Sequence, residues 1–308
     1  MKIAIPDSLK AEVPQTLWGK ILTATPIILT VLSTMLAGLS SSEMTRAQYD
    51  RALGAQLQSK AGDQWGYFQA KRLRGSLQRS TLDLLESAAP LGVFDPARLP
   101  ATAEVRTLLE SDAGRQLTAH LHEGTVPAPP ATASLPPPVQ AVLDAIDASQ
   151  PEPAIAILLN KVSDDMLDNA LRDARLHAAA VDASTAPVNL ALDRLVGLLA
   201  TSADATGAVR RDFIAARLRY TAQRYDGEAR ANQIVANLLE LQVRKNNFSA
   251  NRHHARSQRF FYGMLAAQAA VIISTFAIAA RQRNLLWSLA AAAGLVAVSV
   301  ATYVYLFV

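Results

Sequence analysis

The stretch FFYGMLAAQAAVIISTFAIAA (residues 260–280) contains no charged side chain. After the four residues RQRN it is followed by LLWSLAAAAGLVAVSVATYVYLFV (residues 285–308), which contains none either. As helices the two stretches would be about 31 and 36 Å long, and the hydrocarbon core of a bilayer is about 30 Å thick. Because only four residues separate them, we predict a tight helical hairpin that crosses a membrane twice.

A third uncharged stretch lies near the start of the chain, over residues 21–39, after an N-terminal segment of residues 1–20. It would be about 28 Å long as a helix. A cleaved signal peptide would have a shorter apolar region, and Asp7 and Glu12 precede this one, so we expect an uncleaved anchor. A soluble core helix needs a polar face, and these three stretches have none. The sequence therefore predicts an all-α membrane protein with three transmembrane helices, over residues 21–39, 260–280 and 285–308.

The composition excludes several classes of protein. The chain has no cysteine, which rules out disulfide scaffolds, thiolate metal sites and thiol nucleophiles. Its net charge of +4 comes from 30 basic and 26 acidic residues that are interleaved along the chain. A nucleic-acid-binding domain concentrates its basic residues on one face, so we expect no nucleic-acid partner.

The residues between the first and second membrane segments divide into three parts by proline content. The cap, residues 91–206, holds 11 of the 15 prolines, including the run VPAPPATASLPPP. The parts on either side, residues 43–90 and 207–259, are rich in helix formers and would be about 70–80 Å long as helices. We predict that these two form an antiparallel helical-hairpin stalk, termed stalk helices A and B, that carries a small helical cap.

Each stalk helix has an apolar pattern that needs a partner. In stalk helix A six apolar residues recur at steps of four residues and more, and Ser42 is the predicted N-cap: the six are Leu53, Leu57, Phe68, Leu73, Leu77 and Leu84. In stalk helix B a step of seven residues from Phe213 gives an imperfect coiled-coil pattern. No helix breaker separates stalk helix B from the second membrane segment, so we expect one continuous helix there. Within the cap we predict helices over residues 103–123, 139–149, 153–183 and 188–203.

Clusters of titratable residues give little sign of catalysis. His120 and His122, two residues apart, do not share a helix face, so they do not form the pair that a helical metal site needs. Asp164 and Asp168 would share a face, but no basic partner accompanies them. Since no phosphate-binding glycine loop or nucleophile elbow is present, we expect no enzyme activity, no cofactor and no metal.

The membrane segments offer two functional readings. The third segment places Ala290 four residues before Gly294, a small-residue spacing that permits close helix contact and oligomerisation. The first segment carries Thr23, Thr30 and Thr34, which could line a pore at an oligomer axis. No segment contains an aspartate, glutamate, lysine, arginine or histidine, which disfavours ion-coupled transport.

Basic residues flank the membrane segments on both sides. Arg252, Arg256 and Arg259 precede the second segment, and we expect them to contact lipid headgroups. The short hairpin loop contains Arg281 and Arg283. Short basic loops stay in the cytoplasm, so the large domain would be periplasmic. Seven positive charges lie near the opposite membrane side and favour the reverse orientation.

One nine-residue stretch has a family signature. DQWGYFQAK, residues 63–71, resembles the D-Q-W-x-Y-Y-Q-A-K motif of the bacterial family of unknown function numbered 4337. The resemblance covers about residues 18–88 and 208–308. The chain departs from the family in its longer, proline-rich middle and in Phe68, where the family usually has tyrosine. The resemblance implies a membrane topology but no activity. We expect five residues of the motif to pack stalk helix A against its partner, with Gln69 hydrogen-bonding across: Trp65, Tyr67, Phe68, Gln69 and Lys71.

From these patterns we expect a multi-pass protein of the bacterial inner membrane that contacts lipids and forms a homo-oligomer. Its predicted role is that of a scaffold or interaction protein without catalytic activity. The alternative is a subunit of a passive channel or transporter whose pore is lined by threonines of the first membrane segment.

Overall fold

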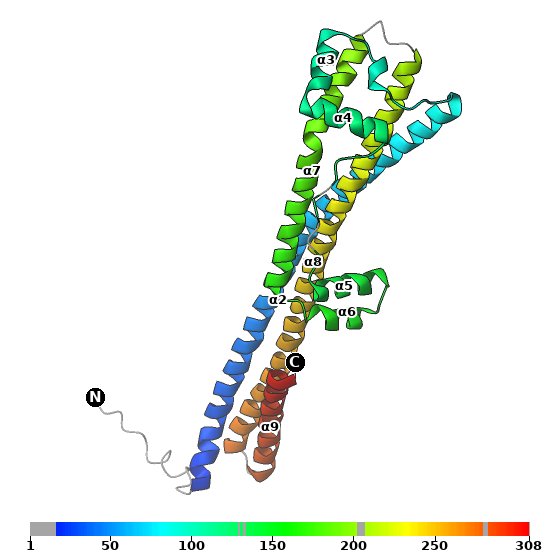
Figure 1. Ribbon diagram of the computed structural model, residues 1–308. Coiled ribbons are helices and arrows are strands. Elements are labelled where there is room, and N and C mark those ends of the chain that lie inside the picture. The colour runs from blue at the N-terminus through cyan, green and yellow to red at the C-terminus, as the bar shows by residue number, and fades with distance from the viewer. Residues whose placement is uncertain (1–16, 129, 132–133, 202–206, 280–282, 308) are drawn as a thin grey trace, which may run out of the picture. The chain divides into compact units, whose positions relative to one another are not determined.

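The computed structural model describes residues 17–128, 130–131, 134–201, 207–279 and 283–307 (Figure 1). Within these ranges the fold is all-α, with eight α-helices, one 3-10 helix and no strand, which confirms the predicted fold class. The elements are α2 (Leu17–Ala88), η1 (Pro96–Arg98), α3 (Ala103–Glu110), α4 (Asp112–Glu123), α5 (Pro137–Asp147), α6 (Glu152–Leu159), α7 (Asp164–Thr201), α8 (Gly207–Ala279) and α9 (Arg283–Phe307).

Three of the described helices, α2, α8 and α9, are long and apolar enough to cross a membrane, as predicted. Helix α8 runs without interruption from the end of the cap through the second membrane segment, which confirms the expected continuous helix. Helix α2 is likewise continuous, so Ser42 lies inside a helix instead of beginning one. Most of the N-terminal segment (residues 1–16) and the basic turn with Arg281 lie outside the described residues.

The chain divides into two compact units. The membrane unit comprises residues 1–54 and 244–308, and the bundle unit comprises residues 55–243. In the membrane unit α9 folds back alongside the C-terminal part of α8 (Figure 1). Leu36 of α2, Phe260 and Ala267 of α8, and Ala297 and Val304 of α9 form its buried core.

Small residues bring the membrane helices close together. A Cβ atom placed on Gly294 of α9 would lie 2.9 Å from Cδ2 of Leu29, and one on Gly263 of α8 would lie 3.4 Å from side-chain atoms of Leu36 and Val300. Ala290, in the small-residue spacing identified in the sequence, is completely buried. Within one chain, this face of α9 is therefore used for packing against α2 and α8.

In the bundle unit three long helices lie side by side. Hydrogen bonds and ion pairs join α2 to α8 in antiparallel order, from Gln64 with Asn232 to Glu86 with Arg219. Helix α7 is antiparallel to α8 as well, because Asp168 accepts a hydrogen bond from Gln242 and Asn189 accepts one from Tyr220. The predicted stalk pair thus has a third helical partner that comes from the cap.

The cap differs from the prediction at three points. The helix predicted over residues 153–183 is interrupted between α6, which ends at Leu159, and the 38-residue α7, which begins at Asp164, and the break predicted at Pro187 is absent because this proline lies inside α7. The hydroxyls of Ser184 and Thr185 donate to the carbonyls of Val181 and Asp182 in the turn before this proline. Residues 103–123 form two helices, because Ser111 ends α3 and caps α4 through a bond from Gly114 N–H.

The face of α2 that is buried in the bundle unit is not the one that its leucines suggested. Its buried residues recur every seven positions as Ala61, Phe68, Gly75 and Leu82. Leu73, Leu77 and Leu84 are 72%, 61% and 70% exposed. Small residues alternate with large ones in this contact, and α8 passes close by at the small ones: a Cβ atom on Gly75 would lie 3.4 Å from the carbonyl oxygen of Ala222.

Candidate functional site

The nine-residue motif lies on α2 within the bundle unit, where it faces α8. Phe68 is buried, and the ring of Trp65 packs edge-on against it with ring centroids 5.4 Å apart. Edge-to-face aromatic pairs add about 0.5–1.5 kcal/mol beyond the burial of their area. The two rings thus supply the apolar part of the contact in a region of α2 where the other buried residues are small.

The hydrogen bonds across the two helices come from Gln64. Its Nε2 atom donates to Oδ1 of Asn232 at 2.7 Å, and Asn232 in turn donates from Nδ2 to the carbonyl of Glu228, also at 2.7 Å. Gln69, for which we predicted this role, lies on the exposed face of α2. In a helix the side chains at positions 64, 68 and 71 share one face and position 69 does not, which explains the difference.

Lys71 forms a buried ion pair with Glu228 of α8. Its ammonium group donates to Oε2 of Glu228, and Arg224 Nε lies 3.4 Å from the other carboxylate oxygen. The side chains of Lys71 and Glu228 are only 14% and 5% exposed. Burial by itself would lower the pKa of Lys71, but hydrogen bonds and charge interactions with Glu228 and Tyr67 outweigh it and raise the pKa.

Two tyrosine rings complete this cluster. The ammonium nitrogen of Lys71 lies 5.0 Å from the ring centroid of Tyr67 and 5.6 Å from that of Tyr225. The guanidinium carbon of Arg224 lies 4.6 Å from the Tyr225 ring. Cation–π contacts of this kind are worth about 0.5–2 kcal/mol. The motif residues therefore hold two helices together through a charged cluster whose members contact each other.

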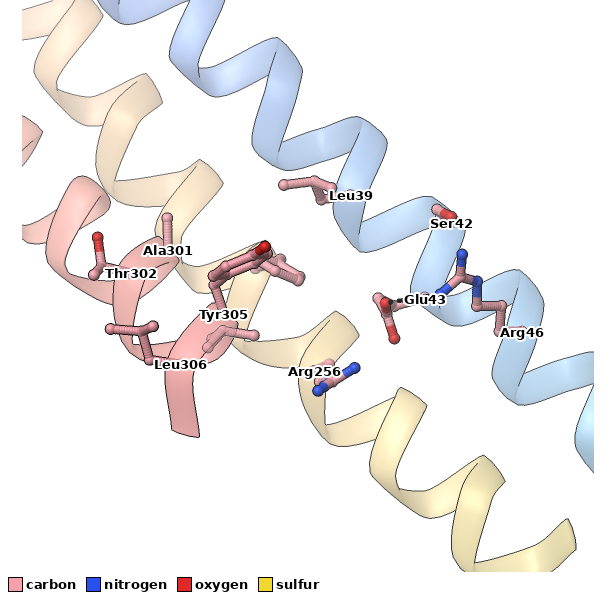
Figure 2. A pocket seen from close by; sticks show the side chains of 11 residues that line it. Leu39, Ser42, Glu43, Arg46, Arg256, Ala301, Thr302, Tyr305 and Leu306 are labelled. Atoms are coloured by element: carbon pink, nitrogen blue, oxygen red, sulfur yellow. Dashed lines mark ion pairs between the residues drawn. The ribbon is translucent and has the colours of Figure 1, made fainter. Parts of the chain in front are cut away.

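A second candidate site is a cavity of 590 Å³ in the membrane unit (Figure 2). Residues from α2, α8 and α9 line it: Leu39, Ser42, Glu43, Arg46, Arg256, Phe260, Ala301, Thr302, Val304, Tyr305 and Leu306. Figure 2 shows Glu43 extending from α2 toward α8, Arg256 lying on α8, and Tyr305 on the side of α9. The cavity thus combines a charged side with an apolar side.

The charged side chains that line this cavity differ in how well they are partnered. Glu43 lies 2.5 Å from Nδ1 of His253 and 3.6 Å from a guanidinium nitrogen of Arg46. The other ring nitrogen of His253 faces Asp50 at 4.0 Å. By contrast, Nε of Arg256 is buried and has no hydrogen-bond partner among the described residues. The carboxylate is therefore already partnered, whereas Arg256 retains a buried donor.

The other residues singled out in the sequence do not converge on one site. Thr23, Thr30 and Thr34 are exposed, and the hydroxyls of Thr30 and Thr34 donate to backbone carbonyls of their own helix. Arg252 is exposed, and the guanidinium carbon of Arg259 lies 5.5 Å from the ring centroid of Tyr303. Across the described ranges, no three histidine or acidic side chains are grouped so that they could hold a metal ion.

Comparison with known protein families gives one result. Residues 18–111 match the family model described as "Domain of unknown function (DUF4337)". This stretch is a DUF4337 domain. The DUF4337 domain contains the motif at residues 63–71 and extends beyond the predicted residue 88 into α3, whereas the similarity expected over residues 208–308 stays a prediction. Neither a curated protein nor a solved structure matches the chain.

Sequence reasoning missed the cavity because its lining comes from three separate parts of the chain. The motif drew attention to the DUF4337 domain, but Arg46 and Glu43 of the same domain carry no such signature. One signal was available: Arg256 and Arg46 each lie within two helical turns of the end of an uncharged membrane segment. Positions of that kind lie at the level of lipid headgroups.

Proposed function

We propose that the protein is a membrane-anchored scaffold that associates with further copies of itself through an apolar stripe on α2. This leucine stripe consists of Ala70, Leu73, Leu77 and Leu84, all of them exposed. The exposure of three leucines on one face of a helix whose opposite face is already packed is the observation that supports the proposal. Burial of one leucine side chain contributes about 1.5–3 kcal/mol.

The spacing of the stripe fits a coiled coil. Its residues follow each other at steps of three, four and seven, which is the alternation of the two core positions of a heptad. In a parallel coiled coil, the residue just before the first core position of a heptad in one helix faces the residue five places further along the other helix. This would bring Gln69 opposite Arg74, and Asp83 opposite Ala88, of the other copy. Neither contact puts like charges together, so charge does not oppose a symmetric pair.

Anchoring in a membrane favours a second copy of the chain as the partner of the leucine stripe. All copies of one protein insert into a bilayer in the same direction, so the helices α2 of neighbouring copies are parallel. Equivalent leucines then lie at the same distance from the membrane and meet across a rotation axis, as closed symmetric oligomers require. Confinement to two dimensions also raises the local concentration of the copies.

An engineered disulfide gives a direct test, because the chain has no cysteine. In a parallel pair, Leu77→Cys places two identical thiols within disulfide distance, so mild oxidation of membranes should give a dimer band on a non-reducing gel. Leu190→Cys, on the equally exposed leucine of α7, is the matched control and should stay monomeric. Equal cross-linking of both variants, or of neither, would refute association through the leucine stripe.

We also propose that the protein is non-catalytic and sits in a bacterial inner membrane, with the bundle unit in the periplasm. The basic hairpin turn found in the sequence supports this orientation. Pro137, at the start of α5, is a suitable position for a single cysteine. In intact cells that cysteine should react with a membrane-impermeant maleimide; reaction only after lysis would place the bundle unit in the cytoplasm.

The passive channel remains the second hypothesis from the sequence, and it depends on Thr23, Thr30 and Thr34. In one chain these residues are exposed, so a pore would need several copies of α2 around an axis. Ion flux into liposomes that contain the purified protein tests this hypothesis. A conductance that changes with Thr30→Val would support it, and equal leakage with and without protein would exclude it.

A further inference from the structure

We propose that the cavity of the membrane unit binds one anionic phospholipid, with the phosphate at Arg46 and Arg256 and an acyl chain along Leu39, Phe260 and Leu306. This site does not depend on self-association, because one chain supplies all of its lining residues. Three features of the cavity support this assignment: its depth in the membrane, its charges and its apolar wall.

The depth follows from the helices that line the cavity. Leu39 is the last residue of the first uncharged segment, Phe260 is the first residue of the second, and Leu306 is near the end of the third. All three segment ends therefore meet at one membrane surface. A phospholipid at this level has its phosphate beside the polar ends of the segments and its chains beside their apolar parts.

The charges of the cavity favour a phosphate. Arg46 and Arg256 contribute two guanidinium groups, and arginine binds phosphate oxygens through pairs of hydrogen bonds. Nε of Arg256 is a buried donor without a partner among the described residues, and such a donor gains from an anionic acceptor. Glu43 would repel a phosphate, but His253 and Arg46 already engage its carboxylate.

The apolar wall supplies room for a chain. Ala301 and Val304 of α9 face the cavity with short side chains, and the rings of Phe260 and Tyr305 border it. A volume of 590 Å³ is within the range of about 300–1,000 Å³ that ligand sites occupy. It suits a headgroup and the upper part of one chain, while the remainder of the lipid lies along the apolar surface of the helices. A free inorganic phosphate would leave this wall uncovered.

General attraction between basic residues and anionic lipids is the competing explanation for lipid binding. Two arginines outside the cavity, one on α8 and one on α2, serve as controls that distinguish it from a specific site. Arg252 lies one helical turn from Arg256 on α8, and Arg51 lies five residues after Arg46 on α2. Both are exposed and neither lines the cavity. If the attraction were general, removal of any one of the four charges would weaken lipid binding by a similar factor.

The test uses native mass spectrometry of the purified full chain in detergent, titrated with phosphatidylglycerol or phosphatidylcholine. We expect one saturable phosphatidylglycerol adduct, and weaker binding of phosphatidylcholine. Arg256→Gln and Arg46→Gln should each weaken the phosphatidylglycerol adduct by about tenfold, the size of a lost charge-assisted hydrogen bond. Arg252→Gln and Arg51→Gln should change it less than about twofold. Equal losses in all four variants would overturn the proposal.

A second variant tests the cavity without a change of charge. Ala301→Trp should fill the space beside Phe260 and abolish the adduct, while circular dichroism checks that the variant remains helical. Thr302 also lines the cavity, but a tryptophan at this exposed position would not fill the space. Excess inorganic phosphate should not displace phosphatidylglycerol, because it lacks an acyl chain. Wild-type lipid binding by Ala301→Trp, or displacement by phosphate alone, would refute a lipid site in this cavity.

Discussion

Ser40 of α2 and Ser257 of α8 bind each other's backbone: Oγ of Ser40 donates to the carbonyl of Ser257 at 3.0 Å, and Oγ of Ser257 donates to the carbonyl of Ser40 at 2.8 Å. Such reciprocal bonds need two helix backbones in close contact, which short side chains permit. The pair lies next to the residues that line the cavity, Leu39 and Phe260, and so fixes the separation of two cavity walls.

Removal of either hydroxyl of this pair should destabilise the membrane unit. Hydrogen bonds between membrane helices contribute about 0.6 kcal/mol on average, with a maximum of about 1.7 kcal/mol. We expect Ser40→Ala and Ser257→Ala each to cost about 0.5–1.5 kcal/mol, measured by unfolding in mixed detergent. The double variant should cost less than the sum, because the two hydroxyl oxygens also lie 3.3 Å apart and either single variant already removes that contact. Thr34→Ala, which removes a hydroxyl that bonds its own helix, is the control, and a fully additive cycle would contradict the prediction.

Gly294 should tolerate alanine but not a large side chain. A Cβ atom at this position would lie 2.9 Å from Cδ2 of Leu29, the mobile end of a flexible side chain that can rotate away. We expect Gly294→Ala to cost below about 1 kcal/mol and Gly294→Ile to cost about 1–3 kcal/mol through overpacking.

The control for this pair is Gly38, where an added Cβ atom would have no neighbour within 4 Å among the described residues of other elements. Gly38→Ile should therefore unfold in detergent at nearly the same midpoint as the wild type. A similar loss at Gly38 and Gly294 would show that isoleucine acts through helix propensity instead of packing.

Removal of one partner of the ion pair between Lys71 and Glu228 should lower the free energy of unfolding. Lys71→Gln leaves the carboxylate of Glu228 buried with Arg224 as its remaining charge partner. Breaking a buried pair costs about 3–5 kcal/mol, and the remaining arginine should reduce this to about 2 kcal/mol. Lys60→Gln, on an exposed position of α2, should change the unfolding free energy by less than about 0.5 kcal/mol. Equal stabilities of the two variants in urea would contradict a structural role for the pair.

Stability should fall at alkaline pH because two groups of the bundle unit hold their protons more tightly when folded. Burial raises the pKa of Tyr220 to about 12 from its ordinary value of 10.0, and the pKa of Lys71 is raised above 10.5. A raised folded pKa contributes stability that is complete below the unfolded pKa and is lost as the pH rises through the folded pKa. The loss should therefore begin near pH 10 and continue to about pH 12.

The variant Tyr220→Phe distinguishes the contribution of Tyr220 to the alkaline loss of stability from that of Lys71. The variant lacks the hydrogen bond to Oδ1 of Asn189, so at about pH 8 we expect it to be less stable by about 1 kcal/mol. Because it has no phenol to ionise, it should lose less stability than the wild type between about pH 9 and pH 12. Circular dichroism melting curves at several pH values measure both effects. Parallel losses in the two proteins would mean that Tyr220 does not contribute to alkaline unfolding.

Replacement of Gly114 should destabilise the cap more than replacement of its other glycines. A Cβ atom there would lie 1.9 Å from the carbonyl oxygen of Leu108, and a backbone atom cannot rotate away as a side chain can. Gly114→Ala should therefore separate α3 from α4 and cost about 2–4 kcal/mol. Gly124→Ala, at a helix end with φ of +68°, should cost about 1 kcal/mol. The thermal midpoints of the two variants should fall in that order, and a reversed order would contradict the steric argument.

The sequence alone predicted the membrane-length helices, the all-α fold and the continuous α8, since each depends on a long local pattern. It correctly placed Phe68 at the contact between α2 and α8, but it also named Leu73 and Leu77, which are exposed, and it missed the buried positions Ala61 and Gly75. Close approach of two helices selects for small side chains, and no single helix reveals the distance of its partner. The cavity could not be predicted for the same reason, because its wall exists only when α2, α8 and α9 are together.

The alanine and glycine positions of α2 in the bundle unit have one more consequence. Ala61 and Gly75 present similar flat surfaces to α8, so these two positions by themselves would not oppose a shift of α2 along its axis by two heptads. The same shift would withdraw Gln64 from Asn232 and Lys71 from Glu228, leaving a charge without its counterpart. The polar pairs of the motif, together with the ring of Phe68, thus define the axial register of the two helices, which the small residues alone leave open.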